Sequence, residues 1–443
     1  MSRPVTVGID IGTSSVKAVA ADDDGTVVAS ARVPHEVRVP SAARLEHDAV
    51  DAWCRGPRQA LAELGDLDVR GVSVAAMVPS LTAVDAGGIP IQPGLLYGDE
   101  RGHTAVHGNP VESGELLAFL RWLVGEAPGA RGYWPAQAVA NHALGGEAVL
   151  DTSTAATAYP LFDWKGWDAT IAEKLGTRPE QFPRLVPTGL EAQRIDGDGP
   201  PLASGCIDAL AEQLVAGADR DGDVLVLLGT TLIVWAVTDR SDAAPGLYVL
   251  PHTVAGKMLV GGPSNAGGLF CNWAAGLLGA PSGPVDAWRV PVWAPYPRGE
   301  RSPLHDPHRR AVLADLDLTH DAAALRRAAF EASGFVTRRI LDVAREHHGI
   351  NPRRLVASGG GTRVDEWVQA VADATNLPVD CVAVPDGGAL GSAWLARIAA
   401  GLEEPTAMTE ARRWARVGRT VEPHPDWVEP VAARYERFRT LAA

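Results

Sequence analysis

The chain has 443 residues, of which 46% are apolar and 21% are charged, and its formal net charge is −14 at pH 7. This length exceeds one ordinary hydrophobic core, so two or three domains are expected. The acidic balance argues against nucleic-acid binding through a general basic surface, but a few local donors and a metal could still hold one polyanionic ligand.

The N-terminal segment predicts a β-hairpin with a polar turn. An apolar strand at residues 5–9 ends at Asp10, and a second apolar segment follows the turn made by Gly12, Thr13 and Ser14. Such a turn can offer backbone N–H groups and hydroxyls to a phosphate, and Asp10 is placed to hold Mg²⁺ or a metal-bound water. An ordinary hairpin with a polar turn is the alternative.

The rest of the first half reads as alternating strands and helices. Strands are expected at residues 27–35, 71–75 and 81–85, and helices at residues 49–64 and 114–126. A polar, proline-rich passage at residues 187–201 marks the approach to a domain boundary. We therefore expect an N-terminal domain at residues 1–202 and a C-terminal domain at residues 203–443.

The second half repeats the opening pattern. A strand at residues 223–228 is followed by Gly229, Thr230 and Thr231 and then by a strand at residues 232–238. Two strand–turn–strand units in one chain suggest two related α/β domains around a cleft.

Two further segments place candidate functional residues at the ends of predicted strands. Asp208 lies at a strand-to-helix junction, where it either caps the helix at residues 209–216 or acts chemically. Gly359, Gly360 and Gly361 follow another strand and precede a helix, although a glycine triplet alone is common in loops.

Taken together, these segments resemble the FGGY carbohydrate kinases, within the superfamily of actin, hexokinase and Hsp70-type ATPases. Seven collinear stretches carry the resemblance over nearly the whole chain: residues 7–17, 93–101, 205–209, 227–231, 294–303, 357–362 and 385–393. The resemblance implies an α/β fold with two ribonuclease-H-like (actin-like ATPase) domains flanking a catalytic cleft. It also implies ATP and Mg²⁺ as cofactors.

The resemblance assigns expected roles to single residues. Asp208 matches the general base that takes the proton of the acceptor hydroxyl, and Asp10 matches the metal-side carboxylate. The residues expected to bind ATP are Gly12, Thr13, Ser14, Gly229, Thr230, Thr231, Gly267, Gly359, Gly360 and Gly361. A capping role for Asp208 would compete with catalysis, because a capping carboxylate spends lone pairs on backbone N–H groups.

The acceptor side departs from the family pattern. Ala76 and Met77 lie where pentulose kinases often read Gln-Met-His, so the methionine is kept and its polar neighbours are not. Tyr97, Asp99 and Arg101 lie where the family often has Trp-Asn-Asp-x-Arg. We expect these five residues to line the acceptor site, and a salt bridge between Asp99 and Arg101 that only holds the loop is the alternative. Loss of polar partners can change acceptor specificity strongly.

The predicted function is ATP-dependent phosphorylation of a hydroxyl of a small sugar or polyol, with a ketopentose such as xylulose as the first choice. The alternatives are a kinase for another polyol, sugar acid or cyclitol, a degenerate sugar- or nucleotide-binding sensor, and a chaperone-like or filament ATPase of the same superfamily. The complete set of catalytic and phosphate-turn residues argues against the sensor.

The remaining features indicate a cytoplasmic protein. The chain runs directly into its first strand without a signal peptide, and it has no run of 18 apolar residues. Its four cysteines lack C-x-x-C spacing, which indicates free thiols in a reducing cytosol. The expected partner is a small-molecule sugar or polyol rather than nucleic acid or a membrane, and the family resemblance is compatible with a homodimer.

Overall fold

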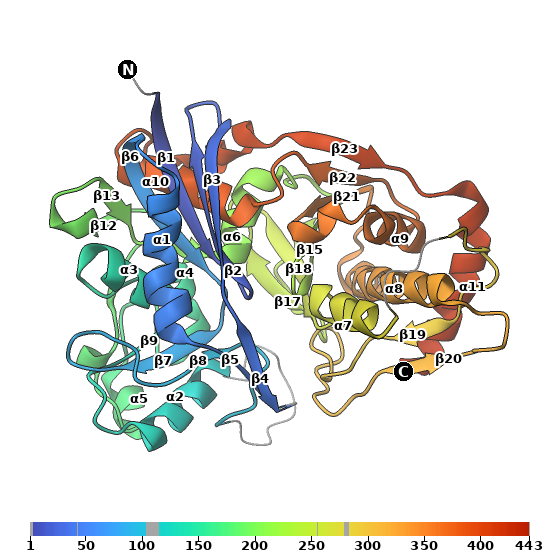
Figure 1. The fold of residues 1–443 in the computed structure, drawn as a ribbon, viewed down its shortest axis with the longest axis horizontal. Helices are drawn as coiled ribbons and strands as arrows, with labels where there is room; N and C mark the ends of the chain where they lie inside the picture. Colours follow the sequence, from blue (N-terminus) through green and yellow to red (C-terminus); the bar gives the residue numbers. More distant parts are fainter. Residues whose placement is uncertain (1–2, 42, 103–114, 255, 279–282, 443) are drawn as a thin grey trace. The chain divides into compact units, whose positions relative to one another are not determined.

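The computed structural model describes residues 3–41, 43–102, 115–254, 256–278 and 283–442 (Figure 1). The chain forms two compact units. Unit 1 comprises Met1–Val215 and Asp386–Trp414, and unit 2 comprises Ala216–Pro385 and Ala415–Ala443.

Unit 1 is built on a mixed sheet whose strand order is β12-β13-β6-β1-β2-β3, with β14 also paired to β6. These strands are β1 (Pro4–Ile11), β2 (Ser15–Ala21), β3 (Val27–Pro34), β6 (Asp68–Ala76), β12 (Glu191–Arg194), β13 (Pro201–Ala203) and β14 (Cys206–Ile207). A five-stranded sheet has the order β4-β5-β8-β7-β9, and β10 pairs with β11. Their bounds are β4 (Val37–Ser41), β5 (Arg44–His47), β7 (Ser80–Val84), β8 (Gly94–Leu96), β9 (Gly132–Trp134), β10 (Val149–Asp151) and β11 (Arg184–Val186).

Helices cover the main sheet of unit 1 from two sides. Its α-helices are α1 (Gly56–Glu63), α2 (Glu115–Glu126), α3 (Ala136–Gly145), α4 (Thr152–Ala155), α5 (Ala169–Lys174), α6 (which begins at Asp208 and ends at Ala216) and α10 (Gly387–Ala399). α10, from late in the chain, packs on β1 and β6, whereas α1 packs on β2 and β3 (Figure 1). Val7, Ile9 and Ile11 lie in the apolar core that also contains Ala60 of α1. Because strand side chains alternate between faces, Gly8 and Asp10 face α10 instead.

Unit 2 has a seven-stranded sheet of order β17-β18-β16-β15-β21-β22-β23. Its strands are β15 (Asp223–Leu228), β16 (Leu232–Thr238), β17 (Tyr248–Pro251), β18 (Met258–Ser264), β21 (Arg354–Ser358), β22 (Val379–Val382), β23 (Val417–Val421) and the separate pair β19 (Val292–Ala294) and β20 (Val312–Ala314). Its α-helices are α7 (Gly268–Leu278), α8 (Ala322–His348), α9 (Asp365–Thr375) and α11 (Val428–Leu441). The largest core cluster of the chain fills this unit, between the sheet and α8, α9 and α11.

The repeat expected from the sequence is present in the strand pairing. β1 pairs antiparallel with β2 and parallel with β6. β15 pairs in the same two ways with β16 and β21. Each unit therefore has a hairpin whose first strand is continued by a parallel neighbour, so the turn and the end of the parallel strand meet at one edge.

The units do not divide at the expected position between residues 202 and 203. β14 pairs with β6, and α6 packs tightly on α10, because a Cβ on Gly391 would lie 1.9 Å from the Ala211 carbonyl oxygen. These contacts place the residues up to Val215 in unit 1. The chain enters unit 1 again at Asp386, because α10 packs on β1.

Two predicted helices differ in detail. The expected helix at residues 49–64 is a π-helical turn at Val50–Arg55 that continues into α1. The one expected at residues 114–126 is α2 from Glu115, and Gly114 lies outside the described residues.

Candidate active site

Asp10 lies near the end of β1 on the face covered by α10. It is 7% exposed, and its Oδ1 atom is buried without a hydrogen-bond donor from the described residues. A Cβ on Gly388 would lie 3.1 Å from Asp10 Cγ, so this glycine at the start of α10 leaves space for the carboxylate. A buried acceptor oxygen without a donor is the kind of atom that a cation would satisfy.

Lys17 lies opposite Asp10 in the β1–β2 ladder and joins two carboxylates. Its Nζ is 3.2 Å from Asp386 Oδ1 and 3.9 Å from Asp10 Oδ2. Asp386 immediately precedes α10, so the lysine links the hairpin to the start of that helix. The lysine side chain is thus engaged by the protein's own carboxylates.

The charges of this cluster shift one another's titration. Burial raises the pKa of Asp10, and Asp386 adds to the rise while Lys17 opposes it. Burial alone would lower the pKa of Lys17, but Asp10, Asp386 and Glu212 together outweigh it and raise that pKa. The lysine therefore stays protonated, and three carboxylates act on it.

Asp208 is the first residue of α6 and follows β14 directly. Burial raises the pKa of Asp208 to about 8, and the charges of Asp10 and Glu212 add to the rise, whereas the Ala209 N–H and Lys17 oppose it. The Ala209 N–H donates to Asp208 Oδ1 at 2.7 Å. A helix cap accepts from an amide two or three residues further along, so this contact is not the usual capping bond.

The turn after β1 is held by its own backbone. The Gly12 N–H donates to the Ser15 carbonyl at 3.1 Å, and the His35 N–H donates to the Ser14 carbonyl at 3.1 Å. Thr13 is buried, whereas Ser14 is exposed. Because the Gly12 N–H is spent within the turn, a phosphate here would have to be bound by Thr13 and Ser14.

The expected acceptor residues lie beside this turn. Ala76 ends β6, and the Met77 N–H donates to the Ile11 carbonyl at 3.2 Å, so both follow the end of β1 closely. Both side chains are buried. The Tyr97 hydroxyl is 2.6 Å from Thr13 Oγ1, which ties the loop after β8 to the turn.

Asp99 and Arg101 form a closed ion pair. Asp99 Oδ1 accepts from the backbone N–H and Nε of Arg101 at 3.0 and 2.8 Å, and Oδ2 accepts from Leu45 N–H at 2.8 Å and from Arg101 at 2.6 Å. Arg101 also contacts Glu46 at 2.6 Å and stacks over Trp122 with its guanidinium carbon 4.6 Å from the ring centre. Both oxygens of Asp99 are therefore occupied, which favours the interpretation that this pair holds the loop.

In unit 2 the second turn is closed by the start of α7. The Gly229 N–H donates to the Thr231 carbonyl at 3.2 Å, two residues along, whereas the Gly12 N–H of the first turn donates to a carbonyl three residues along. The Gly268 and Leu269 N–H groups donate to the carbonyls of Gly229 and Thr230 at 2.8 and 3.0 Å. A Cβ on Gly267 would lie 2.3 Å from the Leu232 nitrogen, so the turn and the helix need glycine at that contact.

The glycine triplet meets this turn at the ends of β15 and β21. Gly359 has φ = +91°, and a Cβ there would lie 2.9 Å from the Leu228 carbonyl oxygen. A Cβ on Gly361 would lie 2.4 Å from the Trp367 ring, whereas Gly360 is exposed. The structure thus brings residues 229–231, 267 and 359–361 together at one edge of the unit 2 sheet.

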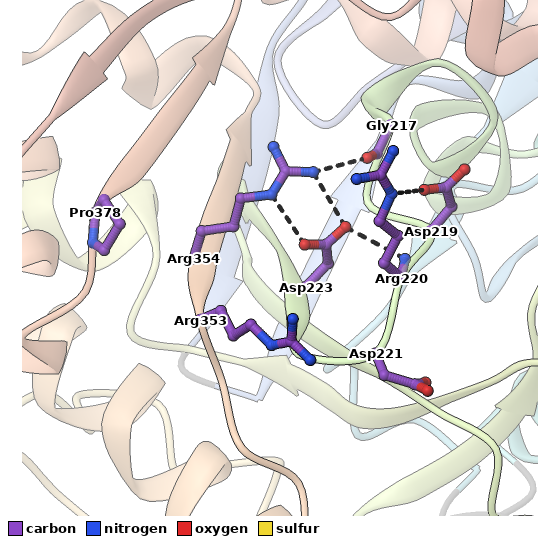
Figure 2. A pocket seen from close by; sticks show the side chains of 8 residues that line it. All are labelled: Gly217, Asp219, Arg220, Asp221, Asp223, Arg353, Arg354 and Pro378. Atoms are coloured by element: carbon purple, nitrogen blue, oxygen red, sulfur yellow. Dashed lines mark hydrogen bonds and ion pairs between the residues drawn. The ribbon is translucent and has the colours of Figure 1, made fainter.

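A cavity of about 570 Å³, lined mostly by charged residues, lies at the opposite ends of the same strands. Figure 2 shows its lining residues: Gly217, Asp219, Arg220, Asp221, Asp223, Arg353, Arg354 and Pro378. Arg354 contacts both oxygens of Asp223, at 2.9 and 3.0 Å, and the Gly217 carbonyl at 3.1 Å. Asp223 and Arg354 begin β15 and β21 and are register partners, so the pair fastens the two strands at the end away from the glycine turns.

Several residues around Asp10 were not expected from the sequence. Asp386 and Gly388 lie in the stretch at residues 385–393, which carried the family resemblance without an assigned role. Glu212 lies one helical turn after Asp208, and that spacing was the available signal. Within the described residues, His, Cys, Asp and Glu side chains form no group of three or more arranged to hold a metal ion.

Both halves of the chain match the same protein family. Residues 5–197 match the N-terminal domain of the FGGY family of carbohydrate kinases, and residues 230–400 match its C-terminal domain. The chain belongs to this family. It is therefore an ATP-dependent carbohydrate kinase, as the sequence predicted.

Relatives of this FGGY kinase include enzymes named for two substrates. It is 29% identical to a xylulose kinase of Streptomyces coelicolor over 93% of this chain and 91% of the relative. It is 24% identical to a gluconokinase of Bacillus subtilis over 83% of this chain and 82% of the relative.

A solved xylulose kinase from Rhodospirillum rubrum superposes on this FGGY kinase with a TM-score of 0.75 at 26% identity, covering 99% of this chain and 98% of that one. The predicted fold of two actin-like α/β domains is confirmed. The described part of the chain contains no helix long and apolar enough to cross a membrane.

Proposed function

We propose that this kinase transfers the γ-phosphoryl group of ATP to a hydroxyl of a ketopentose such as D-xylulose, with Asp208 as the general base. The observation that carries the assignment is the position of Asp208. It begins α6 beside the acidic cluster of Asp10 and Glu212, which helps to raise its pKa to about 8. A carboxylate with a pKa near the working pH can accept a proton effectively.

The proposed step is a direct phosphoryl transfer. The acceptor hydroxyl oxygen bonds to the γ-phosphorus while the bond from that phosphorus to the bridging oxygen of ADP breaks. The hydroxyl proton passes to Asp208, and ADP leaves with the electron pair of the broken bond. The protein contributes position and charge complementarity rather than a covalent intermediate.

We further propose that Asp10 carries Mg²⁺ through its buried Oδ1 atom. The absence of a donor to this oxygen from the described residues supports the assignment. Mg²⁺ bound there would supply positive charge that neutralises the transferring phosphate. Lys17 holds Asp10 and Asp386 in place through Asp10 Oδ2 and Asp386 Oδ1.

The residues proposed to bind ATP come from the glycine-containing turns of each unit. Thr13 and Ser14 in unit 1, after the turn glycine Gly12, are proposed to face the transferring phosphate. In unit 2 the second phosphate turn is proposed to be Gly229, Thr230 and Thr231, and Gly267, Gly359, Gly360 and Gly361 are proposed to border the rest of the nucleotide. Their meeting at the ends of β15 and β21 supports this, because glycines let a ligand approach the backbone closely.

The acceptor is proposed to lie against Ala76, Met77 and Tyr97, in a loop held by Asp99 and Arg101. Xylulose is preferred because the relatives named xylulose kinase reach 29% identity, whereas those named gluconokinase reach 24%. The four free cysteines support a reducing cytoplasmic setting. The expected homodimer rests on the family resemblance alone.

A substrate panel tests the proposed acceptor. ADP release with Mg-ATP is measured across D-xylulose, other ketopentoses, pentitols, glycerol, gluconate and cyclitols. We expect D-xylulose to give the highest kcat/KM, well above the rate without sugar. A clear preference for gluconate or a cyclitol would overturn the acceptor assignment, and no stimulation by any acceptor despite ATP binding would favour the sensor.

A further inference from the structure

A buried chain of hydrogen bonds reaches the turn after β1 from the other side of the sheet. The Trp53 indole N–H donates to His47 Nδ1 at 3.0 Å, and His47 Nε2 is 2.7 Å from the Thr13 carbonyl oxygen. His47 ends β5, and Trp53 lies in the π-helical turn at Val50–Arg55, so both come from regular elements. Both side chains are 0% exposed.

The contact with Trp53 fixes the tautomer of His47. An indole nitrogen can only donate, so His47 Nδ1 must be the acceptor. A neutral imidazole that accepts at Nδ1 carries its hydrogen on Nε2, which then donates to the Thr13 carbonyl. Burial, with a smaller contribution from the nearby His35, lowers the pKa of His47 to about 3 even though the hydrogen bond to Thr13 opposes the shift, so the ring stays neutral in this tautomer.

This donor sets the orientation of a peptide plane in the turn. In a trans peptide the carbonyl and the following N–H point in opposite directions. The Thr13 carbonyl points inward to His47, so the Ser14 N–H points away from the core. The burial of Thr13 and the exposure of Ser14 agree with this orientation. The Gly12 N–H is already bound to the Ser15 carbonyl, whereas the Ser14 N–H faces outward and can donate to a bound phosphate.

We propose that His47 is a positioning residue that aims the Ser14 N–H at the transferring phosphate, and that Trp53 keeps it in the required tautomer. The inference rests on the proposed function, which assigns this turn to the phosphate. His47 itself touches no reacting atom. Its effect passes through the Thr13–Ser14 peptide. By binding the Thr13 carbonyl, His47 fixes this peptide of the turn to the end of β5.

Two substitutions of the same residue separate this role from a general effect on packing. In His47→Gln the side-chain amide nitrogen reaches the position of Nε2 and keeps a donor for Thr13. In His47→Asn the shorter side chain reaches only the position of Nδ1, so it keeps the Trp53 contact and loses the Thr13 contact. Both variants remove the imidazole ring from the core, so we expect similar losses of Tm.

The kinetic result should differ between the two. We expect His47→Asn to lower kcat/KM for Mg-ATP by about tenfold or more, the size of effect that follows loss of a buried hydrogen bond near a charged ligand. His47→Gln should keep kcat/KM for Mg-ATP within about threefold of the parent. KM for the acceptor should change less than KM for Mg-ATP in both. Leu64→Ala, in the same core beyond the end of α1, controls for lower stability alone.

Equal kcat/KM values for the two variants would overturn the role of His47. Ser14→Pro deletes the N–H directly and, at a parental Tm, tests the phosphate assignment separately. Parental turnover by Ser14→Pro would remove the phosphate role of the turn and this inference together. Impaired Ser14→Pro with equal His47 variants would remove only the role of His47.

Discussion

At the residue scale, the arrangement of charge around Asp10 is the central feature of the molecule. Asp10, Asp208, Glu212 and Asp386 all interact with the same cation, Lys17. Without a bound cation, the carboxylates of this group repel one another, and this repulsion lowers the stability of the folded protein, as is common at functional sites. Removing one of the charges should therefore change Tm.

Asp208→Asn should raise Tm, and the increase should be larger at pH 8 than at pH 5. The pKa of Asp208 is raised from 3.8 to about 8, so between these values the folded protein binds a proton that the unfolded chain has lost. Folding stability from this group therefore falls as pH rises through that window, and the neutral amide removes the loss. We expect a gain of a few degrees at pH 8 by differential scanning fluorimetry.

The exposed Asp198→Asn serves as the control and should leave Tm unchanged at both values. A Tm gain for Asp208→Asn that is equal at pH 5 and pH 8, or a loss at pH 8, would contradict the raised pKa.

At the element scale, the close approach of α10 to β1 places the start of the helix beside Asp10. Gly8 makes this approach possible, because a Cβ there would lie 1.8 Å from the Ala389 carbonyl oxygen and 2.3 Å from the Ala393 nitrogen. Both atoms belong to helix backbone and cannot yield like a flexible side chain. The position of Asp386 and Gly388 therefore depends on a glycine in the neighbouring strand.

Gly8→Ala should destabilise the protein by about 3 kcal/mol or more, because α10 must move away from β1. The measurement is the urea midpoint of unfolding, and failure to fold would agree with the prediction. Gly125→Ala is the matched control, since Gly125 is exposed in α2 with no heavy atom near its Cβ position. It should be neutral or slightly stabilising through helix propensity. Equal midpoints for the two variants would show that the strand and helix are not in the contact described.

At the scale of the whole molecule, the features that could be predicted from the sequence are those formed by residues close together in the chain. The hairpin at Asp10, its repeat at Gly229 and the glycine triplet are recognisable because each is a strand end followed by small or polar residues. The pairing of β1 and β15 with parallel neighbours then confirmed the repeat.

The parts that depend on distant contacts were not predictable from the sequence. The unit boundary after Val215 follows from the pairing of β14 with β6, which no local pattern indicates. Asp386 reaches Asp10 only because α10 returns to the first sheet. The occupied oxygens of Asp99 likewise became evident only from the contacts of Leu45 and Arg101.

The most direct test of the proposed mechanism is acceptor-dependent ADP release by Asp208→Asn compared with the parent, at saturating Mg-ATP and D-xylulose. We expect kcat to fall by about 10²-fold or more, because the variant lacks the general base, while the affinity for ADP stays close to the parental value. A variant that retains kcat within about threefold of the parent would contradict the role of Asp208 and, with it, the proposed mechanism.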